Sequence, residues 1–207
     1  TIDTMLKLSQ IHLSLGELKE GRKLLEKALS LMQGSLENTN LLVIESKNTL
    51  AEIYRMQSEY LKAEPLFLQS LEGAVAKFGE EDLLVLQIKS HLAKLYEDTG
   101  KLKKALLYHQ EVYEIDRILL GEEHPNTAGD LNNLASVRRR LGDYQIAEKL
   151  FRKSLSLMIK SLGEESSQSV SVMNNLALLL ENQGLYDEAE PLFKKASAIS
   201  GKILGER

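Results

Sequence analysis

The hydrophobic residues of this chain are spaced as on amphipathic helices, and the helices come in pairs. One stretch carries the i, i+3, i+4, i+7 spacing of a helix face, at Leu131, Leu134, Ala135 and Arg138. A second run follows the turn at Gly142, and one face of it holds Tyr144, Ala147, Leu150, Phe151, Ser154, Leu155 and Met158. It ends at Gly163, since glycine can take the left-handed backbone conformation that closes a helix. The pattern predicts two helices joined by a short turn.

This helix pair recurs along the chain with a period of 42 residues. The turn position is held by Gly16, Ser58, Gly100, Gly142 and Gly184. Five residues later comes a small residue that allows close helix approach, at Gly21, Ala63, Ala105, Ala147 and Ala189. Eight residues before the turn comes a leucine, at Leu8, Leu50, Leu92, Leu134 and Leu176. Because one pair cannot bury its apolar face alone, neighbouring pairs must stack, and we expect an all-α solenoid.

The expected single array has five repeats, at approximately residues 3–44, 45–86, 87–128, 129–170 and 171–207. The first lacks the Leu-Gly ending and has Ser9 and Gly21 where later repeats have alanine, so it is either a diverged terminal unit or a cut edge. The third repeat has His109 at a position where others have phenylalanine. The fourth has Arg138 where the second and third have tyrosine, which should loosen the helix packing there. The last residues, 204–207, repeat an earlier motif only in part. We therefore expect an excerpt from a longer protein.

The alternation of small and large apolar residues resembles the tetratricopeptide repeat (TPR). The usual unit has about 34 residues, so roughly eight extra residues imply about two more helical turns. Further marks of a longer unit are Leu131-Asn132-Asn133-Leu134-Ala135, Ala189-Glu190-Pro191-Leu192-Phe193 and Leu120-Gly121-Glu122-Glu123-His124-Pro125-Asn126-Thr127. Together they resemble the 42-residue kinesin-light-chain subtype, which cargo adaptors and many scaffold proteins share. The resemblance implies five stacked helix–turn–helix repeats in a right-handed superhelix with a concave groove.

Composition narrows the function further. The chain has 207 residues, of which 43% are hydrophobic and 27% charged, as in folded globular proteins. Its 26 Lys and Arg against 30 Asp and Glu give a net charge of −4, so the whole chain attracts neither nucleic acid nor an anionic membrane. No apolar run reaches the ~18 residues of a membrane span. The absence of Cys excludes disulfides and fits an intracellular, cytoplasmic location.

The resemblance assigns the groove-facing side of each first helix as the ligand surface for a protein or peptide partner. The second repeat contributes acid there, through Glu45 and Glu52, and later repeats contribute amide and basic groups. The candidate groove residues are His91, Lys94, Asn132, Asn133, Arg139, Arg140, Asn174, Asn175 and Asn182. Asparagine both donates and accepts, so it can pair with an extended peptide backbone, and arginine can add charge-assisted bonds to a carboxylate.

Kinesin light chains bind short acidic peptides that contain an aromatic residue, and the resemblance carries this role to Lys94, Asn133, Arg140 and Asn175. Three other interpretations stay open. The asparagines could bond to neighbouring helices and stabilise the superhelix. The arginines at 138–140 could simply favour a helix C-terminus. The array could also associate with itself end to end, or act as a scaffold that recognises folded surfaces.

Little in the sequence favours catalysis. The glycines recur singly as helix ends and form no phosphate-binding loop. The four histidines lie in four different contexts without metal-ligand spacing, and His124, before Pro125, fits a turn. The pairs Glu80-Glu81, Glu122-Glu123 and Glu164-Glu165 recur with the repeat, as solvated linker residues able to cap the next helix. We expect no enzyme activity, cofactor, metal or nucleic-acid partner.

Overall fold

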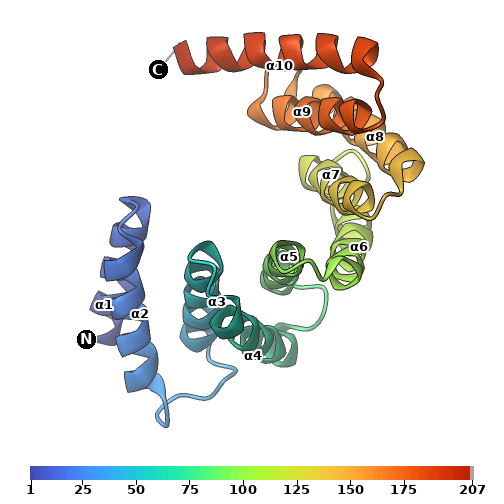
Figure 1. Cartoon of the computed structure of the whole chain (residues 1–207). Coiled ribbons are helices and arrows are strands. Elements are labelled where there is room, and N and C mark those ends of the chain that lie inside the picture. Colours follow the sequence, from blue (N-terminus) through green and yellow to red (C-terminus); the bar gives the residue numbers. More distant parts are fainter. Residues whose placement is uncertain (206–207) are drawn as a thin grey trace. The chain divides into compact units, whose positions relative to one another are not determined.

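The computed structural model describes residues 1–205 and consists there of helices and turns, with no β-strand in that range (Figure 1). The helices are α1 (Ile2–Ser14), α2 (Leu18–Met32), α3 (Leu41–Met56), α4 (Tyr60–Phe78), α5 (Leu83–Asp98), α6 (Leu102–Leu119), α7 (Pro125–Arg140), α8 (Tyr144–Leu162), α9 (Ser167–Asn182) and α10 (Tyr186–Gly205). The last two residues of the partial motif expected at 204–207 lie outside the described residues. Within the described part, no helix is long and apolar enough to cross a membrane.

The chain divides into two compact units, residues 1–100 with α1 to α5 and residues 101–207 with α6 to α10. In the first unit, α1 packs on α2, α2 on α3, α3 on α4 and α4 on α5. In the second unit, α6 to α10 pack in the same serial order. First helices also touch each other, α3 against α5 and α7 against α9. This serial packing confirms the predicted all-α solenoid, while the five repeat boundaries stay predictions.

The two helices of a pair approach closely at the small residue that follows the turn by five positions. Ala63 and Ala147 are completely buried there, and Phe67 and Phe151 fill the adjoining space. In the first repeat this position holds glycine, and the reason is steric. A Cβ added at Gly21 would lie 2.9 Å from a methyl carbon of Leu13 and 3.2 Å from the Ser9 carbonyl oxygen. The helices α1 and α2 therefore approach too closely at this point for an alanine to fit without a shift.

The helix N-caps correct one prediction. The glutamate pairs do not cap the next helix; the residue directly after each pair does. Asp82 Oδ1 accepts from Leu84 N–H at 2.9 Å, and Ser166 Oγ accepts from Ser169 N–H at 3.1 Å. His124 Nδ1 accepts at 3.2 Å from Asn126 N–H, which gives it the expected turn role. Only the cap side chain lies close enough to the free N–H groups of the first turn.

Instead, the linker glutamates of the second unit form ion pairs with lysines of the following second helix. Glu122 pairs with Lys153 on α8, and Glu164 pairs with Lys195 on α10. The neighbouring glutamates also bind lysine, in the pairs Glu123–Lys160 and Glu165–Lys202. These side chains are largely exposed, so each pair stabilises the fold by at most about 1 kcal/mol.

A pair of buried carboxylates lies between α6 and α7. Asp116 is 7% exposed and Asp130 is 8% exposed. In other repeats their positions hold uncharged residues, which are Met32, Ala74, Met158 and Ser200 for the first and Thr4, Ser46, Ile88 and Val172 for the second. Burial, and then the charge of Asp116, raise the pKa of Asp130 to about 8. One of the two carboxyls is therefore protonated near neutral pH.

The pair predicts a pH dependence of stability. A carboxyl whose pKa is raised by folding binds its proton more tightly in the folded state, so its contribution is greatest below its unfolded pKa of about 4 and is lost as pH rises toward 8. We expect the free energy of unfolding of the second unit to fall by on the order of 1–2 kcal/mol between pH 6 and pH 9. Urea denaturation at both pH values measures it.

The variant Asp130→Asn should remove most of this dependence, because an amide cannot ionise. The matched control is Asp187→Asn, at an exposed carboxylate on α10, which should keep the wild-type slope. Equal wild-type stability at the two pH values would contradict the assignment.

Candidate functional site

The nine predicted groove residues fall into the two units. His91 and Lys94 lie on α5 in the first unit. In the second unit, α7 carries Asn132, Asn133, Arg139 and Arg140, and α9 carries Asn174, Asn175 and Asn182. Since α7 and α9 contact each other, the structure places these seven residues on two neighbouring first helices. The residues on α5 form a separate surface of the first unit.

Two of the asparagines form a hydrogen bond between neighbouring first helices. Asn175 Nδ2 donates to Asn132 Oδ1 at 2.9 Å, between α9 and α7. Two repeats earlier, the same positions hold His91 and Asn48, whose Nδ1 and Oδ1 atoms lie 3.0 Å apart. The bond between Asn132 and Asn175 agrees with the structural interpretation of the asparagines, and their role in the groove stays a prediction. The Asn132 amide N–H groups and the Asn175 carbonyl oxygen are still capable of further hydrogen bonds.

His91 contributes no positive charge at neutral pH. Its imidazole packs against the Phe67 ring, with 5.8 Å between ring centroids. Burial is the main cause that lowers the pKa of His91 below its usual value. Lys94, by contrast, is exposed on the same helix and supplies a cation there.

An arginine of the first unit shows how a cation on this face is normally neutralised. Arg55, on α3, donates from Nε to Glu52 Oε2 at 2.8 Å and from Nη2 to Glu52 Oε1 at 2.7 Å. Its Nη1 also donates to Asp98 on α5. These two carboxylates raise the pKa of Arg55 above its usual value. The acid predicted for the second repeat at Glu52 is thus engaged within the fold.

Arg139 stands two repeats after Arg55 and lacks both carboxylates. The positions of Glu52 and Asp98 are taken there by Ser136 and Asn182. The Arg139 side chain is half-buried, and its Nε is buried with no hydrogen-bond partner among the described residues. A guanidinium that is partly withdrawn from water and not paired with a carboxylate is a strong site for one. Sequence reasoning named Arg139 but missed this difference, which a comparison of the two columns would have found.

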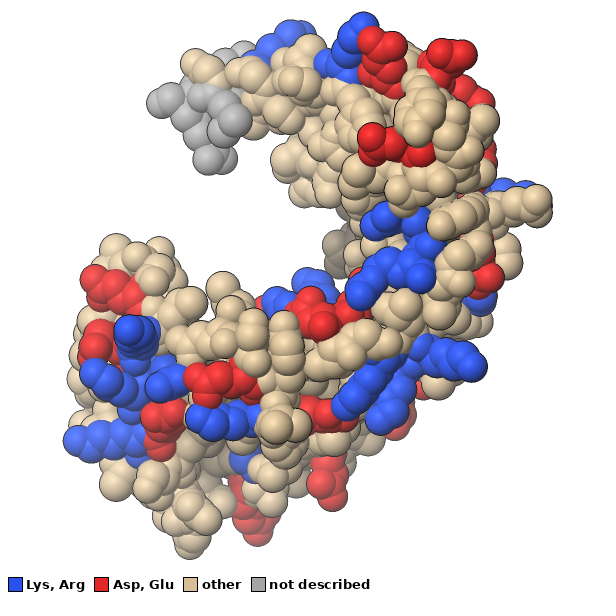
Figure 2. Space-filling model, in the orientation of Figure 1, with Lys and Arg blue, Asp and Glu red and all other residues tan. Residues whose placement is uncertain are grey.

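The three consecutive arginines of α7 therefore differ in role. Arg138 Nη1 donates to Asp143 Oδ2 at 2.9 Å and so braces the turn that follows α7. Arg139 is half-buried and Arg140 is exposed. Figure 2 shows basic and acidic side chains interspersed on the visible face.

Comparison with known proteins gives the family. The family model described as a tetratricopeptide repeat matches residues 1–74, 44–118 and 129–202. The chain belongs to the tetratricopeptide repeat family. No match was found among curated protein sequences. Within the described residues, no group of three or more His, Asp or Glu side chains is placed to hold a metal ion.

Three solved structures share the TPR fold. Nearly identical TPR-like repeats described as a kinesin light chain of Podosopora anserina match with a TM-score of 0.81 and 22% identity over 98% of this chain and 96% of that one. BtubC (BKLC) from P. vanneervenii matches with a TM-score of 0.81 and 21% identity, over 99% and 81%. A Rap protein complexed with competence and sporulation factor matches with a TM-score of 0.75 and 17% identity, over 95% and 53%.

These comparisons confirm a TPR protein with a kinesin-light-chain-like fold. TPR arrays are protein–protein interaction scaffolds and are generally not catalytic, so this chain is a scaffold for protein or peptide partners. The expectations of no enzyme activity, no cofactor and no nucleic-acid partner stay predictions.

The amide pair between α7 and α9 gives a second prediction. A double-mutant cycle with Asn132→Ala and Asn175→Ala, measured by urea denaturation, should show a coupling of about 0.5–1.5 kcal/mol, the net value of one hydrogen bond. Asn174→Ala combined with Asn132→Ala is the matched control and should be additive. Additivity in the first pair, within about 0.3 kcal/mol, would rule out the bracing role.

Proposed function

We propose that this TPR scaffold binds an extended acidic segment of a partner protein on α7 and α9, with Arg139 as its anchor. The observation that carries the proposal is the contrast between two equivalent arginines. Arg55 is neutralised by Glu52 and Asp98, whereas Arg139 has neither carboxylate, and its buried Nε has no hydrogen-bond partner among residues 1–205. The planar guanidinium can bind a carboxylate with two parallel hydrogen bonds.

The amide groups around Arg139 support an extended peptide as the ligand. Asn133 and Asn174 are half-buried, and Asn182 is exposed. No hydrogen bond to these three side chains is present within the described residues, so they are able to pair with a peptide backbone. Each such bond contributes roughly 0.5–1.5 kcal/mol, and several in a row give useful affinity. The Rap protein that shares this fold is likewise complexed with a factor.

The aromatic residue of the partner segment is part of the same proposal. It rests on the resemblance to kinesin light chains, which is carried by the Leu131-Asn132-Asn133-Leu134-Ala135 motif. Arg140 is exposed at the end of the same helix and adds a second cation beside Arg139. Lys94 and His91 belong to the first unit, and we propose Lys94 as a separate and weaker contact for acidic residues.

A proteome-derived peptide array, followed by titration of the enriched peptides, tests this function. We expect enrichment of acidic peptides that contain an aromatic residue. Arg139→Glu should weaken their binding at least tenfold, and Arg139→Lys should have an intermediate effect, because lysine cannot form the two parallel bonds. Lys149→Glu, on the second helix α8, makes the same charge change at an exposed residue and should bind as wild type.

A flat array, or an Arg139→Glu variant that folds and binds acidic peptides as wild type does, would contradict the proposal. Lys94→Glu and Arg140→Glu, measured separately, show which of the other two cations contributes.

Self-association is a second candidate, favoured by the apolar outer face of α1. Leu8 is 42% exposed, although Leu50 and Leu92 in the same column are buried. Ile11 and Leu15 follow at helical spacing and are exposed as well. If two copies stack through this face, the sedimentation coefficient should rise with concentration, and the triple variant Leu8→Gln, Ile11→Gln, Leu15→Gln should abolish the rise. A mass that does not change with concentration rules this candidate out.

A further inference from the structure

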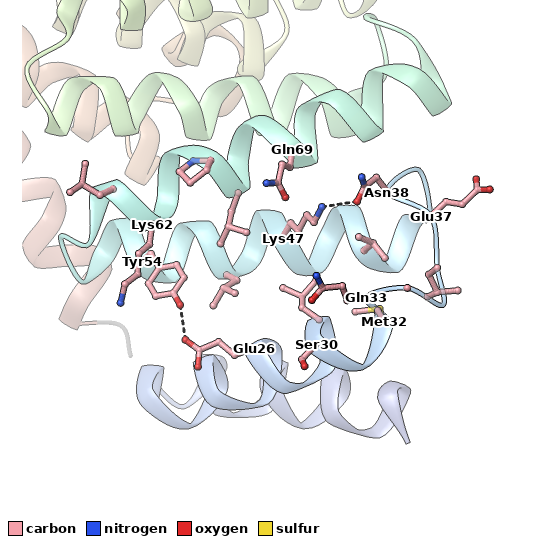
Figure 3. A pocket seen from close by; sticks show the side chains of 18 residues that line it. Glu26, Ser30, Met32, Gln33, Glu37, Asn38, Lys47, Tyr54, Lys62 and Gln69 are labelled. Atoms are coloured by element: carbon pink, nitrogen blue, oxygen red, sulfur yellow. Dashed lines mark hydrogen bonds between the residues drawn. The ribbon is translucent and has the colours of Figure 1, made fainter.

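The first unit contains a cleft of about 940 Å³ between α2 and the α3–α4 pair (Figure 3). Its inner wall is apolar, with Met32, Val43 and Leu50 buried at the base. Two leucines at its rim face solvent, since Leu61 is 94% exposed and Leu36 is 38% exposed. The cleft thus has the volume of a ligand site, with an apolar base and a polar wall on which Glu26, Glu37 and Lys47 carry charge.

The cleft results from the shortness of α2. This helix has 15 residues, against 19 in each of α4 and α8. The missing last turn leaves space beside α3, and the chain from 33 to 40 runs instead as a loop toward α4. That loop passes so close to α4 that a Cβ at Gly73 would lie 2.5 Å from the Asn38 carbonyl oxygen. Other repeats have isoleucine or leucine at this position, at Ile115, Leu157 and Ile199.

Lys47 lies at the centre of the cleft without a carboxylate partner. Its Nζ donates to Asn38 Oδ1 at 2.9 Å, and within the described residues no carboxylate lies within ion-pair distance of it (Figure 3). Burial lowers the pKa of Lys47, because it partly removes the cation from water, and the negative charge of Glu72 only partly offsets this effect. The other lysine at the cleft, Lys62, is paired with Glu59 at 2.5 Å.

In the next repeat, the lysine at the same position has a carboxylate partner. Lys89 occupies the same position 42 residues later, is 6% exposed, and pairs with Glu80 Oε2 at 2.7 Å. The position of Glu80 in the cleft repeat is Asn38. A neutral amide therefore stands at Asn38 where the next repeat has the carboxylate that pairs with its lysine.

We propose that this cleft binds a peptide segment of a partner protein that inserts a large aliphatic side chain and places a carboxylate against Lys47. The apolar base accommodates the aliphatic group, and Lys47 supplies the charge that complements the carboxylate. Gln33 and Gln69, at the cleft wall, offer amide groups for the peptide backbone. The site lies wholly in the first unit, so it is independent of the surface around Arg139.

The test uses two short probes, N-acetyl-leucyl-leucyl-glutamate amide and its glutamine counterpart, titrated into the full chain. The methyl signals of Met32 and Val43 are followed by NMR. We expect saturable shifts with the acidic probe and roughly tenfold weaker binding of the neutral one, because only the first supplies a carboxylate. Lys47→Met should reduce binding of the acidic probe to the level of the neutral probe.

Substitution of Asn38 provides the matched variants. Asn38→Glu restores the pair seen between Lys89 and Glu80, so it should raise the thermal midpoint and lower the affinity for the acidic probe roughly tenfold. Asn38→Gln has the same size without the charge and should bind the acidic probe as wild type. Arg139→Glu should leave the titration unchanged, which separates this site from the proposed groove function.

Three results would overturn the proposal. They are the absence of shifts at the Met32 and Val43 methyl groups, equal binding of the acidic and neutral probes, and an unchanged affinity in folded Asn38→Glu.

Discussion

Within each of the two units, the structure depends on the close approach of paired helices at the small residue that follows the turn by five positions. Ala63 and Ala147 are fully buried at this contact, and even alanine would meet Leu13 at the position of Gly21. A larger side chain there would separate the helices and misplace the aromatic residues Phe67 and Phe151 that fill the seam. Because this contact and the stacking of neighbouring pairs bury the apolar columns, the remaining columns are free to vary between repeats.

At those positions, the repeats differ in whether a half-buried cation has a carboxylate partner. A half-buried cation without a carboxylate is costly, and two of these cations have carboxylate partners within the fold. Arg55 has Glu52 and Asp98, and Lys89 has Glu80. The equivalent cations Arg139 and Lys47 have lost these partners by substitution in the neighbouring columns. The loss at Lys47 lies in the cleft beside α2, and the loss at Arg139 lies on α7, which contacts α9. We interpret both as sites at which a partner protein supplies the missing carboxylate.

Much of the fold could be predicted from the sequence because a period of 42 residues records the helix pairs and their stacking. The site could be predicted only in part. The bond between Asn132 and Asn175 joins residues from two different repeats, so its existence depends on the exact helix spacing. The caps were misassigned to the glutamates because capping depends on which side chain reaches the first-turn N–H groups, as Asp82 does. The carboxylates Asp116 and Asp130 stand out in two otherwise uncharged columns, but only the structure shows that they face each other between α6 and α7.

We propose that the missing carboxylates around Arg139 leave a site for an acidic partner. The double substitution Ser136→Glu, Asn182→Asp restores at Arg139 the two carboxylates that neutralise Arg55. Titration with the acidic peptides enriched on the array, with Ser136→Gln as the neutral control, measures the consequence directly. We predict that the double variant is at least as stable as wild type and loses affinity at least tenfold, while the control binds as wild type. Unchanged affinity in the folded double variant would contradict the account.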